Sequence, residues 1–134
     1  MKTKELKGKR FLEHISKMEA QLEEKNDELA YWKRQKMIYQ EDKMIAENVE
    51  KRSVELQAMI RLLTEQKLSA TKLIDSVEDP VGRAILRRRY ILCDTWKKIA
   101  VACGKMSERN AHYIHDQALL DFEKIYCGSK AVFI

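Results

Sequence analysis

The sequence predicts an all-α protein in which long, heptad-patterned helices precede a C-terminal group of three shorter helices. Glycine occurs four times and proline once in 134 residues, which leaves little of the turn chemistry that a sheet protein of this size needs. Charged residues make up 35% of the chain, as in long solvated helices, and hydrophobic residues make up 45%, enough for a packed core. Apolar residues also recur at three- and four-residue steps through most of the chain.

The first predicted helix covers residues 5–34. Its apolar positions follow one another at steps of three or four residues or their multiples: Leu12, Ile15, Met18, Leu22, Leu29 and Trp32. The polar stretch 33–43 loses this register. We therefore expect a turn, or a skip in the pattern, within that stretch.

The second predicted helix covers residues 42–77 and has a stricter period. Ten positions alternate at steps of four and three residues: Ile45, Val49, Arg52, Leu56, Met59, Leu63, Gln66, Ala70, Leu73 and Val77. A 3.5-residue repeat of this kind imposes a left-handed supercoil. Arg52 and Gln66 are polar insertions of the sort that fix the register of such a seam at some cost in stability.

This apolar stripe needs a partner, and two are open: the first helix, in a hairpin, or a second copy of the chain, in a coiled coil. We favour a homo-oligomer, most simply a dimer. Its oligomerisation seam would consist of Ile45, Val49, Leu56, Met59, Leu63 and Leu73. Residues 1–79 are accordingly interpreted as a helical coiled-coil or oligomerisation region.

Residues 80–134 are predicted to hold three helices. Asp79 before Pro80 is a helix-start signature, an N-cap acceptor followed by proline at the first helical position. The helices 80–91, 96–103 and 108 to about 126 are separated by turns at 92–94 and 104–106, with Thr95 and Ser107 as caps and Gly104 in the second turn. Two helices joined by a short, glycine-containing turn are typical of a helix-turn-helix DNA-binding domain.

The formal charge is unevenly distributed. Residues 80–134 hold 10 Lys and Arg against 5 Asp and Glu, so the whole excess of +5 lies in this C-terminal part. A basic small domain beside a charge-balanced helical region indicates a polyanion as partner, with double-stranded DNA or RNA first. A solvated surface that happens to be basic is the alternative.

Polar side chains gather near the N-terminus of the third C-terminal helix, away from its apolar face. The candidates for base contacts are Glu108, Arg109, Asn110, His112 and Tyr113. In the major groove, arginine pairs bidentately with guanine, asparagine with adenine, and glutamate accepts from cytosine N4. The candidates for phosphate contacts are Arg87, Arg88, Lys97, Lys98, Lys105 and Ser107.

The C-terminal motif also carries a family resemblance. It combines Arg89-Tyr90, Trp96 followed by Ile99-Ala100, the Ser107 cap, Ile114-His115 and Ala118-Leu119. Residues 83–122 thereby resemble the sigma-factor region-four type of helix-turn-helix and, more closely, the ArpU/RinA-like regulators of phages and prophages in Gram-positive bacteria. Arg88 and Glu108 depart from that pattern, because an apolar residue is common at the first position and a basic or neutral one at the second.

The resemblance implies a DNA-binding regulator, an activator of late phage genes for packaging and lysis, that has RNA polymerase as a possible further partner. It implies base contacts by Glu108, Arg109, His112 and Tyr113. A phage small terminase subunit and a structural coiled-coil adaptor are the alternatives that remain open. A complete sigma factor is disfavoured, because residues 1–79 lack a basic-aromatic cluster for promoter melting.

Metal binding and catalysis are not expected. The spacings among Cys93, Cys103, His112 and His115 include no C-x2–4-C knuckle. Cys103 is predicted to face the core, His112 to point away from it, and His115 to lie at its edge. No Gly-rich phosphate loop, HExxH or paired-carboxylate motif is present, so we expect neither an enzyme nor a cofactor.

The cellular location is predicted from the lack of a membrane-spanning run and of a signal peptide. No apolar run approaches the roughly 18–20 residues that span a bilayer. The basic N-terminus lacks the apolar core of a signal peptide, and three irregularly spaced cysteines fit free thiols. We therefore expect a protein of the bacterial cytoplasm without a membrane partner.

Overall fold

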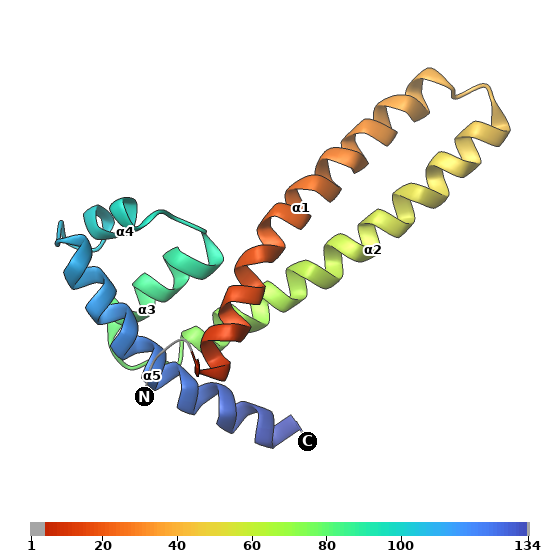
Figure 1. Cartoon of the computed structure of the whole chain (residues 1–134). Helices are drawn as coiled ribbons and strands as arrows, with labels where there is room; N and C mark the ends of the chain where they lie inside the picture. Colours follow the sequence, from red (N-terminus) through yellow and green to blue (C-terminus); the bar gives the residue numbers. More distant parts are fainter. Residues whose placement is uncertain (1–4, 134) are drawn as a thin grey trace. The chain divides into compact units, whose positions relative to one another are not determined.

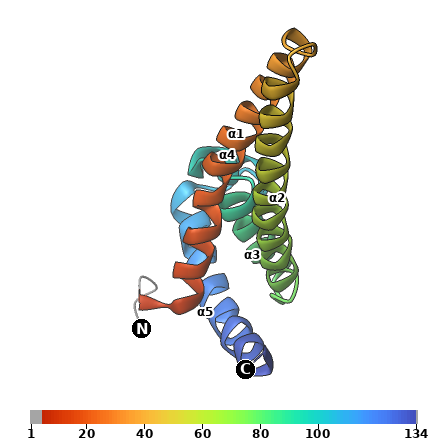
Figure 2. The same cartoon turned by 90° about the vertical axis from the view of Figure 1, so that its right-hand side faces the viewer.

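The computed structural model describes the backbone of residues 5–133 and the side chains of residues 5–129, and within that range it contains no strand. The described part is all-helical and holds two long helices followed by three others (Figures 1 and 2). Their bounds are Lys7–Ile38 (α1), Lys43–Ile74 (α2), Pro80–Leu86 (α3), Trp96–Ala102 (α4) and Glu108–Phe133 (α5). The all-α prediction is confirmed.

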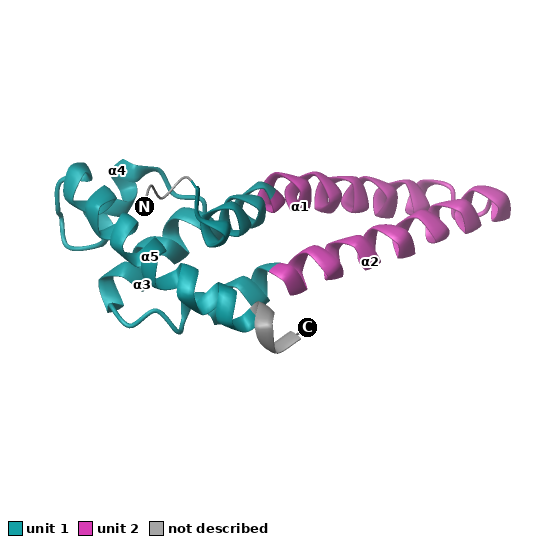
Figure 3. Cartoon of the chain, turned by 60° about the horizontal axis from the view of Figure 1, so that its bottom comes forward, with its two compact units in different colours: residues 1–17, 67–134 teal, residues 18–66 magenta. Residues whose placement is uncertain are grey.

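The chain divides into two compact units, coloured separately in Figure 3. Unit 2 is residues 18–66, the facing parts of the two long helices and their connection. Unit 1 combines residues 1–17 with residues 67–134. The unit that holds α3, α4 and α5 therefore extends beyond residues 80–134, because the start of α1 and the end of α2 belong to it.

Unit 2 is a hairpin in which α1 and α2 run antiparallel (Figure 1). The connection falls at residues 39–42, inside the stretch where the helical register was expected to break. Asp42 stabilises the start of α2, since its carboxylate accepts a hydrogen bond from the Ile45 N–H at 3.2 Å.

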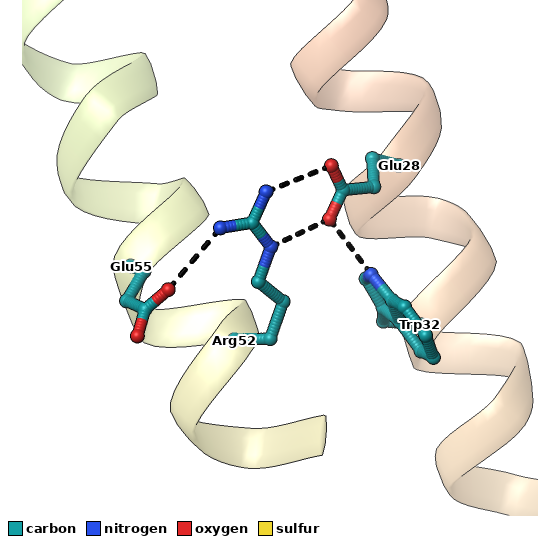
Figure 4. A network of polar contacts seen from close by, with 4 residues as sticks. All are labelled: Glu28, Trp32, Arg52 and Glu55. Carbon is teal, nitrogen blue, oxygen red and sulfur yellow. Dashed lines mark hydrogen bonds and ion pairs between the residues drawn. The ribbon is translucent and has the colours of Figure 1, made fainter. Parts of the chain in front are cut away.

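Arg52, one of the polar insertions in the heptad pattern, joins the two helices of the hairpin (Figure 4). Its Nε and Nη2 donate to the two carboxylate oxygens of Glu28 at 2.7 and 3.0 Å, and Trp32 Nε1 donates to the same carboxylate at 2.8 Å. These hydrogen bonds lower the pKa of Glu28 to about 2, and the hydrogen bonds that Arg52 donates to Glu28 and Glu55 raise the pKa of Arg52. A bidentate pair of this geometry defines one register of α1 against α2.

The predicted oligomerisation seam is largely covered within one chain. Val49 and Leu56 are buried, Ile45 and Leu63 are half-buried, and Leu73 packs against the core of unit 1. Of the six seam residues, Met59 alone is exposed, at 40%. The centre of this seam is therefore closed to a second copy while the fold is intact.

The core of unit 1 joins both ends of its sequence. Its buried members come from the N-terminal segment, the end of α2, α3 with the following turn, and α5: Leu6, Leu12, Ile74, Val77, Leu86, Tyr90, Ala118, Leu119 and Phe122. A second cluster, Ile85, Ile99, Ala100 and Ala111, packs α4 against α3 and α5. The apolar faces of these helices are buried or half-buried. Their buried residues are Ile85, Leu86, Tyr90, Ile99, Ala100, Ala111, Ala118 and Phe122, and their half-buried ones are Trp96, Cys103, Ile114 and Ile125.

The α3 helix lies close against α5. The Asp79 side chain caps it by accepting from the Gly82 N–H at 3.1 Å, as the Asp-Pro signature predicts. A Cβ on Gly82 would come within 3.0 Å of the Ala118 Cβ, so glycine permits this approach. Beyond α3 the chain does not continue as an ordinary α-helix to Ile91 but widens into a π-helical turn at Arg87–Ile91.

Candidate nucleic-acid interface

The connection between α4 and α5 is built from two side-chain caps and one tight turn. Thr95 Oγ1 accepts from the Lys98 N–H at 3.2 Å and begins α4. Gly104 and Lys105 both have positive φ, 106° and 55°, and Gly104 adopts this value without steric cost. Ser107 Oγ accepts from the Asn110 N–H at 3.1 Å and begins α5. Both predicted caps and the glycine turn are confirmed.

The first turns of α5 bring the predicted base-contact residues onto an exposed surface. Glu108, Arg109, Asn110, His112 and Tyr113 are exposed, whereas Ala111 between them is fully buried. The helix therefore rests on its small apolar residue and presents the polar ones to solvent. Glu108 lies in the first turn, where the helix dipole stabilises a negative charge.

Three of the predicted phosphate-contacting residues are engaged in ion pairs. Arg87 Nη1 lies 2.9 Å from an Asp75 carboxylate oxygen, Arg88 Nη1 lies 3.1 Å from Asp94, and Lys98 Nζ lies 3.4 Å from Asp94. The structure thus gives Arg87 and Arg88 a structural task. Within the described part of the chain, Lys97 and Lys105 are exposed and have no charged partner.

Asp94 organises the loop that leads into α4. The residue is 8% exposed, its carboxylate forms ion pairs with Arg88 and Lys98, and its backbone carbonyl accepts a hydrogen bond from Arg89 Nη1 at 3.2 Å. An arginine at position 88, where the resemblance leads one to expect an apolar residue, is explained by this buried carboxylate. The loop that carries Thr95 is thereby tied to the preceding helix.

Two imidazole rings and one guanidinium group pack around the Trp96 indole. The His112 ring centroid lies 3.7 Å from that of Trp96, and the Arg89 guanidinium carbon lies 4.9 Å from the same ring. The His115 ring meets Trp96 edge-on at 4.9 Å. His112 is exposed, as predicted, but its ring is held against Trp96, so its direction on the surface is defined.

His115 is buried in the core and does not lie at its edge, which corrects the sequence-based expectation. Only 4% of the residue is exposed, and its Nε2 lies 2.7 Å from the Tyr90 hydroxyl. Its Nδ1 lies 3.1 Å from the Asp116 carboxylate. Burial lowers the pKa of His115 to about 4 and raises that of Tyr90. The neutral imidazole therefore accepts from Tyr90 and donates to Asp116.

This burial predicts a pH dependence of stability. Because the pKa of His115 is lower in the folded chain than its ordinary value of 6.5, the unfolded chain binds the proton more tightly. The contribution of His115 to the free energy of unfolding should be fully present above pH 6.5. It should be lost as the pH drops from about 6.5 towards about 4. In His115→Gln, whose amide can still accept from Tyr90, melting temperatures followed by circular dichroism should fall less steeply over this range. His112→Gln, at an exposed site, is the control, and equal slopes in wild type and His115→Gln would contradict the assignment.

A hollow of about 640 Å³ next to this cluster includes residues that sequence reasoning missed. Lys9 and Lys17 of α1 line it together with Arg89, Trp96 and His112. No local pattern could have found the two lysines, because the contacts join residues near opposite ends of the sequence. Glu13 and Asp116 also line the hollow, and Lys9 Nζ lies 4.0 Å from the Glu13 carboxylate, so charges of both signs surround it.

Other kinds of site are not formed by the described residues. No three His, Cys, Asp or Glu side chains among them are placed to hold a metal ion. In the same part of the chain, no helix combines the length and apolar character that a membrane crossing requires. Cys93 and Cys127 are exposed, and Cys103 is half-buried against the α4 cluster.

Comparisons with known proteins give no further guide. Scans against protein-family models, curated proteins and solved structures found no match for this chain.

Proposed function

We propose that this chain is a sequence-specific, double-stranded-DNA-binding transcriptional regulator in which α4 and α5 form a helix-turn-helix. One observation carries the proposal. Near the capped N-terminus of α5, the exposed residues are Glu108, Arg109, Asn110, His112 and Tyr113, whereas Ala111 among them is buried and anchors the helix. This is the part of a recognition helix that meets base edges in the major groove. The exposed side chains include donors for guanine and adenine and an acceptor for cytosine.

The surrounding charges support a polyanionic partner. Lys97 on α4 and Lys105 in the turn are exposed and form no ion pair within the described residues. Arg109, four residues after Lys105, lies on α5. We propose that these two lysines, one on α4 and one in the turn that follows it, contact phosphates of the DNA backbone. Arg87 and Arg88 contribute to this surface mainly by holding Asp75 and Asp94.

The finer part of the proposal rests on the resemblance of residues 83–122. It makes the domain a sigma region-four-like helix-turn-helix and the chain an ArpU/RinA-like activator of late phage or prophage genes, with RNA polymerase as a possible second partner. The exposed Glu108 at the front of the helix suits a cytosine-containing site, since a carboxylate accepts from cytosine N4.

The decisive experiment is to incubate the purified chain with fragments of its source genome and sequence those that it retains. Fragments that adjoin late-gene promoters support the regulator. Retention at a packaging start site instead would indicate a terminase-like role, and the absence of salt-dependent retention would indicate a structural adaptor.

Lys97→Ala should weaken binding to all DNA sequences alike. Its loss removes one phosphate contact, so the slope of log K against log salt concentration should fall by about 0.9. Fluorescence anisotropy on a retained fragment and on random DNA, over a salt series, measures both effects. Lys33→Ala, an exposed lysine of unit 2, is the matched control. An unchanged slope in Lys97→Ala would remove this residue from the interface.

A further inference from the structure

The outer face of α2 in unit 2 carries a short pattern that neither the hairpin nor the proposed DNA contact uses. Lys51, Val54, Ala58, Leu62 and Glu65 are all exposed, Val54 by 55% and Leu62 by 57%. Lys51, Ala58 and Glu65 follow one another at seven-residue steps, so they lie along one line of the helix. Val54 and Leu62 lie four residues to either side of Ala58 and flank that line.

This pattern is complementary to itself when reversed about Ala58. Seven residues before it is a cation, Lys51, and seven residues after it is an anion, Glu65. At four residues on each side, both positions are apolar. We propose that this face binds a second copy of the chain, with the two α2 helices antiparallel and a two-fold axis passing between the two Ala58 residues.

At each helical turn of such a pair, the side chains of one helix face complementary side chains of the other. The two Ala58 methyl groups allow the backbones to approach closely at the axis. One turn away, Val54 of one protomer lies beside Leu62 of its partner on the opposite flank of the contact. Two turns away, Lys51 faces Glu65, and symmetry repeats this ion pair at the other end.

The charges also select one orientation. In a parallel pair about a two-fold axis, Lys51 would face Lys51 and Glu65 would face Glu65, which is repulsive at both levels. In the structure, Lys51 and Glu65 have no charged partner within the described residues, so both are available. The heptad seam itself is not, since Val49 and Leu56 are buried within the single chain. This inference does not depend on the proposed DNA binding.

Sedimentation equilibrium of the full chain over a series of protein concentrations tests the proposal. Wild type should reversibly dimerise, and the dimer should weaken as salt is raised. Lys51→Glu and Glu65→Lys each turn both symmetry-related ion pairs into repulsive contacts, so each should raise the dimer Kd by about tenfold. An equimolar mixture of the two variants should form a heterodimer with affinity close to that of wild type, because each acidic face then meets a basic one.

The double variant Lys51→Glu/Glu65→Lys restores opposite charges within one chain and should dimerise like wild type. Lys33→Glu, a charge reversal on an exposed position of α1, should leave the Kd unchanged. Circular dichroism of each variant shows whether the helices are intact. A wild-type chain that is monomeric throughout the series overturns the proposal. So does a dimer whose Kd in both single variants equals that of wild type, or a pair of variants that fail to associate when mixed.

Discussion

Phe122→Ala should lower the free energy of unfolding by about 3–5 kcal/mol, the largest effect expected of any single change here. The side chain is fully buried in the unit 1 core. Its ring lies 6.4 Å from that of Phe11 and 6.2 Å from that of Tyr126, in stacked geometry. Removing it leaves a cavity between α1 and α5, and the contact that joins the two ends of unit 1 is lost. Urea unfolding followed by far-ultraviolet circular dichroism measures the change.

Leu120→Ala serves as the matched control for this experiment. It lies two residues away on the same helix and is 36% exposed, so its loss should cost well under half as much. A cost below about 1 kcal/mol for Phe122→Ala would mean that the two ends of unit 1 do not share one core.

The second large effect concerns DNA. If α5 reads bases, Arg109→Ala should weaken binding to the retained genomic sequence by about 1–3 kcal/mol and relax the preference at one base pair. Arg109 is exposed and touches no charged partner among the described residues, so its truncation should leave the fold unchanged. Competition binding with single-base variants of the retained sequence measures both the loss and the position affected.

Lys124→Ala, an exposed residue farther along the same helix, separates base reading from general charge. It removes the same formal charge but lies away from the N-terminal turns of α5. Equal losses for Arg109→Ala on the retained and on random DNA would contradict base reading by Arg109, even if DNA binding itself is established.

The helices and their ends could be predicted because their signals are local. The periodicity of apolar residues located both long helices, and the caps at Asp79, Thr95 and Ser107 make the hydrogen bonds expected of them. Gly104 has the positive φ expected of a turn glycine. Such features need only neighbouring residues, which the sequence places side by side. The exposed edge of α5 follows from the same periodicity.

Contacts between distant residues could not be predicted in this way. The partner of His115 is Tyr90, 25 positions away, so its spacing suggested the edge of the core. Arg88 was a candidate for phosphate because nothing local showed that Asp94 becomes a buried carboxylate. The heptad repeat specified an apolar seam, but the identity of the partner that covers Val49 and Leu56 depends on the tertiary fold.

The interleaving of the two units bears on the order in which the chain assembles during synthesis. The Gly8 N–H donates to the Glu123 carboxylate at 2.6 Å across 115 residues of sequence, so unit 1 is incomplete until residue 123 has left the ribosome. Unit 2 is closed by the Arg52–Glu28 pair, across only 24 residues. Forming that hairpin first shortens the effective loop between residues 17 and 67 and lowers the entropic cost of joining the two ends. The hairpin thus brings the two sequence segments of unit 1 closer together before the core that they share can form.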